Sequence, residues 1–309
     1  MDERIYFLTK DERGNEIYIR RDDLLPFSFG GNKEIIAKAQ IDDMVKKGRD
    51  IMIGYGNSRS NFCRVLTALC YSKNIPCKII SPLDDDDTFT PSFNNSLVKM
   101  TGAEIITCKK SEAKKTIDSV KKSCRNSGLK PYFVYDIKNI AAPVKAFSKD
   151  FSKIKTCFDD IFIAVGTGIT TSGILAGMVK KSIKEGTIRT SLIGISVARS
   201  TEREMPVISS YVKTQGRAVS DFYEDNREKL FVLRDDFVGK GYGSIEEDVE
   251  KTVREIYLRF GIALDPTYTG KAFYGMKKYI EENGLRGKKI LFWHTGGLPL
   301  FFDYFEQKR

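Results

Sequence analysis

Short apolar runs rich in β-branched residues alternate with longer helix-like stretches along most of the chain, and this order constrains the fold most. Continuous apolar runs are typical of strands buried on both faces of a parallel sheet. Parallel neighbours need long crossovers, which are usually helices, so we predict an α/β fold with largely parallel, open, twisted sheets flanked by helices. The expected strands span 17–24, 50–56, 76–82, 103–109, 131–136, 160–168, 191–198 and 290–293, and the expected helices 33–47, 61–74, 92–102, 111–128 and 170–182.

Composition fits a soluble globular protein with a large core. The chain has 309 residues, of which 41% are hydrophobic and 30% charged, which is long enough for two lobes. No uninterrupted apolar stretch reaches spanning length, and the start, MDERIYFLTKDERG, is charged. We therefore expect neither a transmembrane helix nor a signal peptide, no membrane partner, and a cytoplasmic location.

The formal charge of +10 does not by itself indicate a nucleic-acid partner. Lysines are interleaved with acidic residues, the one strong run is acidic (84–87), and no nucleic-acid-binding module is recognisable. The six cysteines form no CxxC pair, and His294 is the single histidine. We therefore predict no metal site and no Ser/His/Asp triad, and expect the reaction to use another base.

Glycine-rich turns follow three of the expected strands, at 54–61, 165–173 and 294–297. Ligands of open α/β sheets gather at the carboxyl ends of strands, and a helix N-terminus after such a turn attracts anions. The turn VGTGITTSG lacks both the GxGxxG spacing and a GK[ST] sequence, so a nucleotide P-loop is not supported. Its hydroxyl side chains favour a single phosphate monoester, with a close packing turn as the alternative.

A further glycine turn, FSFGGNK, places Lys33 where a helix is expected to begin. Three interpretations are open for this segment: an ordinary loop, a phosphate cradle, or a lysine amine used in the chemistry. Together with the phosphate-binding turn, the lysine suggests pyridoxal phosphate, which needs a Schiff-base lysine and a phosphate cup.

Six segments in order resemble one family of enzymes, the D-cysteine desulfhydrases and 1-aminocyclopropane-1-carboxylate deaminases, which use pyridoxal phosphate. The segments are YIRRDDLLPFSFGGNK, GNSRSNFCR, VGTGITTSG, DDFVGKGYG, DPTYTGKAFYGM and LFWHTGGLP, and they extend over residues 18–300. The resemblance implies the tryptophan synthase β-subunit fold (fold type II), with a large lobe of residues 1–46 and 146–309 and a small inserted lobe of residues 47–145. It also implies a homodimer, with the cofactor between the lobes.

The resemblance also assigns roles to residues of this chain. Lys33 corresponds to the Schiff-base lysine, Asn61 to the partner of the cofactor's 3′ oxygen, and Thr295 to the partner of its ring nitrogen. Ser60 and Tyr268 correspond to catalytic residues that face the substrate, although Ser60 could instead cap its helix and Tyr268 could belong to the core. The implied phosphate cup consists of Gly166, Thr167, Gly168, Ile169 and Thr170.

The implied reaction is β-elimination from a small amino acid, giving pyruvate and ammonia. A neutral Lys33 would remove the α-proton, and the neutral Thr295 beside the ring nitrogen favours rapid loss of a β leaving group over transamination. The deaminase branch has an acidic residue after the tyrosine and a leucine before GG. This chain has Thr269 and Thr295 at those positions, as in the desulfhydrases, so cyclopropane ring-opening is the second choice.

Three departures from the family pattern leave the substrate open: Arg59 replaces a glutamine, Phe62 a histidine and Ile169 a glycine. Arg59 could bind a second acid group, as in cysteate or O-phosphoserine, or it could support the loop. Asn61 is expected to contact the substrate as well as the cofactor. A non-catalytic cofactor-binding protein is the alternative from another class, and the presence of Ser60 and Tyr268 disfavours it.

Overall fold

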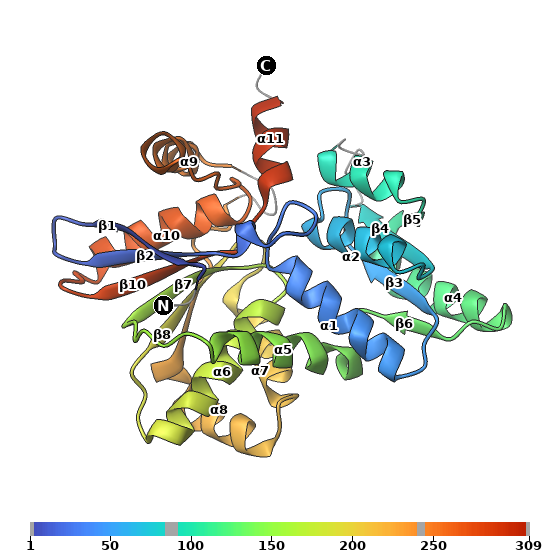
Figure 1. The fold of residues 1–309 in the computed structure, drawn as a ribbon, viewed down its shortest axis with the longest axis horizontal. Helices are drawn as coiled ribbons and strands as arrows, with labels where there is room; N and C mark the ends of the chain where they lie inside the picture. The colour runs from blue at the N-terminus through green and yellow to red at the C-terminus, as the bar shows by residue number, and fades with distance from the viewer. Residues whose placement is uncertain (1–2, 84–91, 240–244, 307–309) are drawn as a thin grey trace. The chain divides into compact units, whose positions relative to one another are not determined.

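The computed structural model describes residues 3–83, 92–239 and 245–306 (Figure 1). The chain divides into two compact units: the first comprises residues 1–32 and 144–309, and the second residues 33–143. The expected large lobe extended to residue 46, but helix α1 (Lys33–Lys46) packs on α2 (Asn61–Ser72) and belongs to the second unit. The acidic run at 84–87 and the end of the DDFVGKGYG segment lie outside the described residues.

The first unit is built on a six-stranded sheet with the order β1-β2-β10-β7-β8-β9. Its strands are β1 (Ile5–Lys10), β2 (Glu16–Arg21), β7 (Asp160–Val165), β8 (Ser191–Ser196), β9 (Phe231–Arg234) and β10 (Lys289–His294). Only the pairing of β1 with β2 is antiparallel among these described strands, and all the other pairings are parallel. The carboxyl ends of β2, β7, β8 and β10 therefore meet at one edge, where the glycine turns begin.

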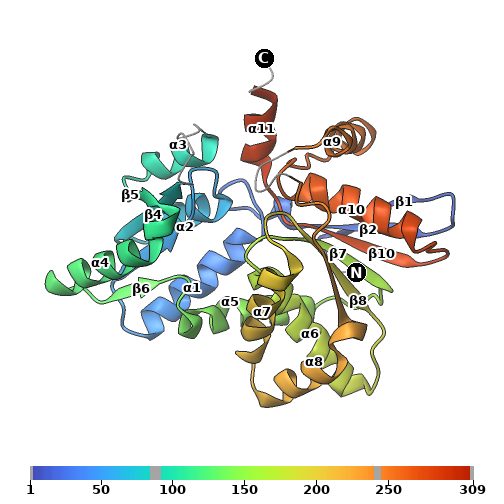
Figure 2. The same ribbon diagram turned by 180° about the vertical axis from the view of Figure 1, so that it is seen from behind.

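Helices cover both faces of this sheet. They are α6 (Ile169–Glu185), α7 (Thr201–Lys213), α8 (Arg217–Leu230), α9 (Glu247–Phe260), α10 (Thr269–Glu282) and α11 (Leu298–Glu306), and α5 (Ile137–Phe151) crosses the boundary between the units. Both views show α10 on one side of the strands and α6 and α8 on the other (Figure 1, Figure 2). The strands between these helices are buried on both faces, as their continuous apolar sequences predict.

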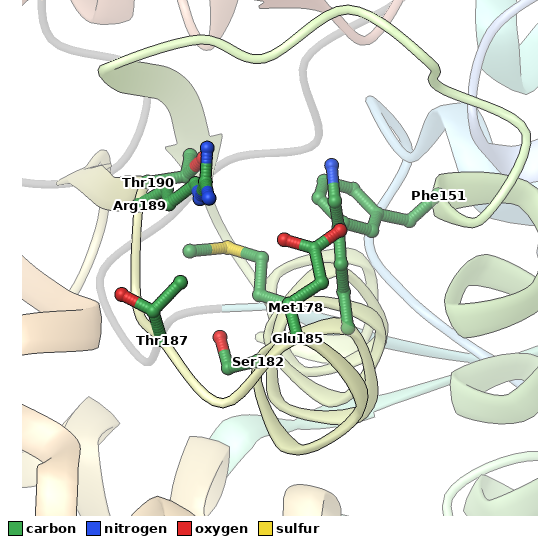
Figure 3. A pocket seen from close by; sticks show the side chains of 8 residues that line it. Phe151, Met178, Ser182, Glu185, Thr187, Arg189 and Thr190 are labelled. Atoms are coloured by element: carbon green, nitrogen blue, oxygen red, sulfur yellow. The ribbon is translucent and has the colours of Figure 1, made fainter.

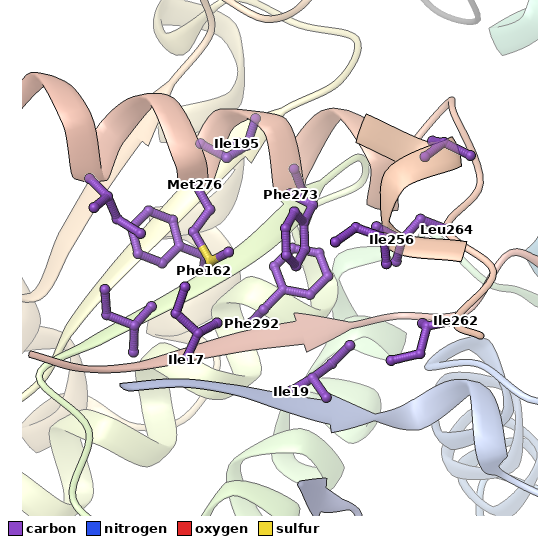
Figure 4. Close-up of a cluster of buried hydrophobic side chains, with 14 of the residues drawn as sticks. Ile17, Ile19, Phe162, Ile195, Ile256, Ile262, Leu264, Phe273, Met276 and Phe292 are labelled. Atoms are coloured by element: carbon purple, nitrogen blue, oxygen red, sulfur yellow. The ribbon is translucent and has the colours of Figure 1, made fainter. Parts of the chain in front are cut away.

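The core of the first unit lies between α10 and the strands (Figure 4). Phe273 and Met276 of α10 contact Ile17, Ile19 and Phe292 from the sheet, and the rings of Phe273 and Phe292 are 4.9 Å apart. Removing an aromatic side chain from such a core costs about 3–5 kcal/mol. This packing fixes the direction of α10, and with it the turn at the start of that helix.

The second unit has a four-stranded parallel sheet with the order β5-β4-β3-β6. Its strands are β3 (Ile51–Tyr55), β4 (Cys77–Leu83), β5 (Glu104–Lys109) and β6 (Pro131–Phe133), and its remaining helices are α3 (Phe93–Met100) and α4 (Ala113–Asn126). Helix α4 packs its Cys124 against Ile51, Ile80 and Phe133 of the sheet. Short 3-10 turns complete the two units at Asp22–Leu24 and Lys110–Glu112.

None of the helices in the described ranges is both long enough and apolar enough to span a bilayer.

Candidate active site

The glycine turn after β7 ends in an uncapped helix N-terminus. Gly168 is the N-cap residue of α6, has a left-handed backbone (φ 73°), and makes no side-chain cap hydrogen bond. The N–H of Ser172 donates to the carbonyl of Gly168 at 2.8 Å, which is the first bond of the helix. The preceding N–H groups, those of Ile169, Thr170 and Thr171, have no acceptor within the helix. Together with the helix dipole they form an anion-binding site.

Side chains around this turn fit a bound phosphate. A Cβ on Gly166 would lie 3.2 Å from Cε1 of Tyr268, and a Cβ on Gly168 would lie 3.0 Å from Oε1 of Glu204. Both positions therefore favour glycine, because neighbouring side chains occupy the space that a Cβ would need. Thr170 Oγ1 accepts a hydrogen bond from Asn32 Nδ2 at 2.9 Å. Its own proton therefore remains available to donate to a phosphate oxygen.

The turn before Lys33 is fixed to the same end of the sheet. Gly30 and Gly31 have φ angles of 67° and 101°, and a Cβ on Gly30 would lie 2.0 Å from the carbonyl oxygen of Asp23. The N–H of Asn32 donates to the carbonyl of Thr295 at 3.0 Å. Because Asn32 also bonds Thr170, the residue directly before Lys33 is held by two of the three predicted ligand-binding turns.

A buried ionic cluster holds the start of this turn. The Asp22 carboxylate accepts hydrogen bonds from Trp293 Nε1 at 2.7 Å and from Arg4 Nη1 at 2.7 Å. Arg20 stacks 4.2 Å from the centre of the Trp293 ring and pairs with both Asp22 and Asp150. The carbonyl of Asp22 accepts from the N–H of Gly31. The cluster therefore helps to shape the turn before Lys33.

Lys33 has the electrostatic environment of a reactive amine. Its side chain is partly buried, and burial lowers the pKa of Lys33 from the usual 10.5 to about 8. A substantial fraction of the amine is therefore neutral near physiological pH, which is the form that reacts with an aldehyde.

His294 is the last residue of β10, Thr295 follows it, and the two residues have different environments. His294 is 1% exposed, its Nδ1 accepts from the N–H of Gly296 at 3.2 Å, and its Nε2 lies 3.7 Å from Asp23 Oδ2. Burial lowers the pKa of His294, so the ring is neutral and packs behind the strand end. Thr295 is partly exposed, and its carbonyl holds the turn before Lys33.

Asp265 positions the Tyr268 turn, a role that the sequence analysis missed. Its fully buried carboxylate accepts hydrogen bonds from the N–H groups of Thr267, Tyr268 and Thr269 and from the Thr269 hydroxyl. Burial raises the pKa of Asp265 to about 6, against the lowering effect of these hydrogen bonds. A Cβ on Gly297 would lie 2.4 Å from Asp265 Oδ2, so the same carboxylate contacts the HTGG turn. The available sequence signal for this role was an aspartate, Asp265, followed directly by proline and four residues later by Thr269.

In the second unit, Arg59 and Ser60 lie on the loop before α2, and Asn61 is the first residue of that helix. Ser60 Oγ accepts from the N–H of Cys63 at 3.1 Å and caps the helix, as the alternative interpretation of this residue stated. The cap uses the oxygen as an acceptor and leaves its proton for another partner. Phe62, which stands where the family has histidine, is 6% exposed and packs near Tyr135.

The structure thus brings several predicted residues together within the first unit: the phosphate turn contacts Tyr268 through Gly166 and Asn32 through Thr170. A small pocket elsewhere in this unit is not a candidate site (Figure 3). It lies beside Met178, Ser182 and Arg189 and has a volume of about 10 Å³, enough for about one water molecule. None of the predicted residues lines it.

Comparison with known proteins identifies the class of this enzyme. The chain matches the family of pyridoxal-phosphate-dependent enzymes over residues 4–296, and it belongs to that family. The cofactor of this protein is therefore pyridoxal phosphate, as the sequence analysis predicted.

Individual relatives agree with the narrower resemblance. A Pyrococcus horikoshii protein, provisionally named 1-aminocyclopropane-1-carboxylate deaminase, is 32% identical over 95% of this chain and 88% of its own length. A D-cysteine desulfhydrase from Klebsiella pneumoniae is 26% identical over 95% of this chain and 90% of its own length. The crystal structure of an ACC deaminase homologue superposes with a TM-score of 0.79 at 28% identity, covering 96% of this chain and 89% of the other. The predicted fold class and family are confirmed.

Proposed function

We propose that this enzyme catalyses β-elimination from a small amino acid, as a D-cysteine desulfhydrase does, and releases pyruvate and ammonia. The observation that carries the proposal is the environment of Thr269, the position at which the deaminase branch has an acidic residue. Thr269 is fully buried, and its hydroxyl donates to Asp265 Oδ2 at 2.8 Å. Thr269 thus stabilises the start of α10 and supplies no acid for opening a cyclopropane ring.

The residues of the first unit fit the binding of the cofactor. The N–H groups at the start of α6 and the Thr170 hydroxyl would hold the phosphate, and Thr295 would hydrogen-bond the ring nitrogen. Pyridoxal phosphate supplies an electron sink for the charge that develops at the α-carbon of the substrate. A neutral hydroxyl at the ring nitrogen, unlike a carboxylate, does not hold a full positive charge there. This favours fast departure of a β leaving group.

The remaining roles belong to Lys33, Ser60 and Tyr268. Lys33 would bind the cofactor covalently and then, as a neutral amine, accept the α-proton, which its lowered pKa allows. The Ser60 proton is free of the helix cap and would be given to the substrate or the leaving group. Asn61 would bond the 3′ oxygen of the cofactor and contact the substrate, and Tyr268 would lie beside the substrate.

The test is substrate profiling of the holoenzyme with D- and L-cysteine, D-serine, cysteate, O-phosphoserine and 1-aminocyclopropane-1-carboxylate. We expect sulfide and pyruvate from a cysteine isomer. Turnover of the cyclopropane substrate alone would favour the deaminase activity, which the name of the Pyrococcus relative supports. A preference for cysteate or O-phosphoserine would assign Arg59 to a second acid group of the substrate.

A variant separates the enzyme from a non-catalytic cofactor-binding protein. Lys33→Ala should fold, lose the visible absorbance of the covalently bound cofactor, and lose turnover. Visible absorbance that survives in this variant would show that another lysine holds the cofactor. We further propose that the enzyme works in the cytoplasm as a homodimer, in keeping with its family resemblance.

A further inference from the structure

In the second unit, the loop that ends at Ser60, together with Asn61 at the start of α2, is hydrogen-bonded to the start of α3. Ser92, the N-cap residue of α3, donates from Oγ to the carbonyl of Ser58 at 2.6 Å. Two positions further on, Asn94 Nδ2 donates to the carbonyl of Arg59 at 2.9 Å and to Asn61 Oδ1 at 3.0 Å. A helix remote in sequence therefore holds the loop at three places.

The orientation of the Asn94 amide follows from its third partner. Arg64 is 2% exposed and donates from Nε to Asn94 Oδ1 at 2.8 Å. A guanidinium has only donors, so the oxygen of Asn94 must face Arg64 and its NH₂ group must face the loop. Asn94 is fully buried and both of its N–H groups are used, one on the Arg59 carbonyl and one on Asn61.

The polarity of Asn61 is then determined in turn. Asn94 offers it a donor, so Asn61 must turn its carbonyl oxygen toward Asn94. The NH₂ group of Asn61 is at the other end of the amide. Arg64 thus fixes the orientation of the Asn94 amide, and Asn94 fixes the orientation of the Asn61 amide, through two successive hydrogen bonds.

We propose that Asn94 is a positioning residue that makes Asn61 a hydrogen-bond donor toward the 3′ oxygen of the cofactor. The inference rests on the proposed role of Asn61. A donor stabilises the anionic form of that oxygen, whereas the amide carbonyl would stabilise its protonated form. Control of this proton thereby depends on a residue of α3 that need not touch the cofactor itself.

Asn94→Asp tests the proposal because it preserves shape and reverses polarity. The introduced carboxylate would still pair with Arg64, but it can only accept, so Asn61 would have to rotate and present its oxygen to the cofactor. We expect the ratio of protonated to anionic 3′ oxygen to rise at least about tenfold, the effect of one hydrogen bond to a charged group. Absorbance of the bound cofactor would move from the visible toward the near ultraviolet.

Asn95→Asp is the matched control, since Asn95 is 7% exposed on the same turn of α3 and has no part in the proposed polarity. It should leave the spectrum unchanged. Equal spectral changes in the two variants, or none in Asn94→Asp, would overturn the proposal. If the Asn94→Asp variant does not fold, Asn94→Ala replaces it in the test. Its spectrum should shift in the same direction as that expected for Asn94→Asp, but to a smaller extent. An unchanged spectrum in Asn94→Ala would also overturn it.

The wild-type spectrum separates this test from that of the proposed function. If wild-type protein shows no visible band that depends on Lys33, the proposed function itself fails. If that band is present and Asn94→Asp leaves it unchanged, only the positioning role of Asn94 fails.

Discussion

Burial lowers the pKa of Lys33 to about 8, which is the one large lowering among the lysines of the described residues. Desolvation causes this lowering, and no acidic group contributes to the shift. A carboxylate partner would hold the amine charged, whereas desolvation favours the neutral form. The turn before it, with left-handed Gly30 and Gly31, places the residue at the first position of α1.

The first prediction is that the apoenzyme reacts with pyridoxal phosphate at a rate that rises with pH through about 8, because only neutral Lys33 reacts. An ordinary lysine would give a midpoint near 10.4. The measurement is the stopped-flow increase of visible absorbance between pH 6 and 10, with borohydride trapping and peptide mapping to locate the label. A rate that still rises steeply at pH 10 would show that the amine is solvated when the cofactor arrives.

The second prediction separates the two roles of Ser60. Ser60→Ala should lower the free energy of unfolding by about 1 kcal/mol through loss of the cap, and lower turnover about 10²- to 10⁴-fold through loss of the hydroxyl. Ser60→Gly is the matched variant, because glycine at an N-cap costs only a few tenths of a kcal/mol. Urea melts and steady-state kinetics should show that Ser60→Gly is nearly as stable as wild type but equally impaired. Full activity in the Ser60→Gly variant would show that Ser60 only caps the helix and takes no part in catalysis.

At the scale of elements, the N-terminus of α6 has a glycine, Gly168, at its N-cap, and no side chain caps its first turn. Gly168 packs its Cα against α7, where a Cβ would lie 3.0 Å from both Glu204 Oε1 and Ile208 Cγ1. At the other end of α6, Gly186 has nearly the same backbone (φ 69°), but a Cβ there would meet no atom within 4 Å. The same helix therefore contains a test position and its control.

The third prediction is that Gly186→Ala costs about 1–2 kcal/mol of stability, the usual cost of a left-handed alanine, and leaves cofactor affinity unchanged. Gly168→Ala should cost more, because the added methyl group must displace the turn from α7, and should weaken cofactor binding at least about tenfold. Thermal melts of the apoenzymes and equilibrium titration with pyridoxal phosphate give both quantities. Equal affinity in the two variants would mean that this turn does not hold the phosphate.

Strands and turns could be predicted from the sequence wherever a single local pattern determines the secondary structure. Strands β3, β7, β8 and β10 contain continuous apolar runs, and the turns after β3, β7 and β10 contain glycine, so both could be predicted. Helices α5 and α7 to α11 were not assigned, and α5 and α7 contain Pro143 and Pro206, which normally disfavour a helix interior. Tertiary packing overrides that local preference here.

The site was predictable only in part, for a related reason. Lys33 and the phosphate turn carry local signals, whereas Asp265 and Asn94 act through hydrogen bonds to residues whose own roles must be known first. The unit boundary depends on packing as well: α1 follows the lysine without a break, and its contacts with α2, Tyr132 and Val134 place it in the second unit. Long-range contacts of this kind have no local sequence pattern.

For the whole molecule, the exposed apolar residues of α9 and α11 bear on assembly. Leu258 is 77% exposed and Phe302 53% exposed. The rings of their sequence neighbours, Tyr257 and Phe301, lie 5.6 Å apart and join the two helices. Single exposed apolar residues are ordinary, but a group on adjoining helices is a candidate contact surface for a second copy of the chain.

The last prediction is that the holoenzyme is a dimer of about twice the 35.0 kDa chain mass and that Leu258→Glu dissociates it. A charge buried in an apolar interface without a partner is strongly unfavourable, so the equilibrium should shift toward monomer. Met100→Glu is the control: Met100 is 78% exposed on α3 of the second unit, so the change in surface charge and exposure is matched. Light scattering coupled to size exclusion measures both variants over a range of concentrations. A wild-type mass of 35.0 kDa would contradict the dimer, whereas a Leu258→Glu variant that remains dimeric would place its contact surface on other elements.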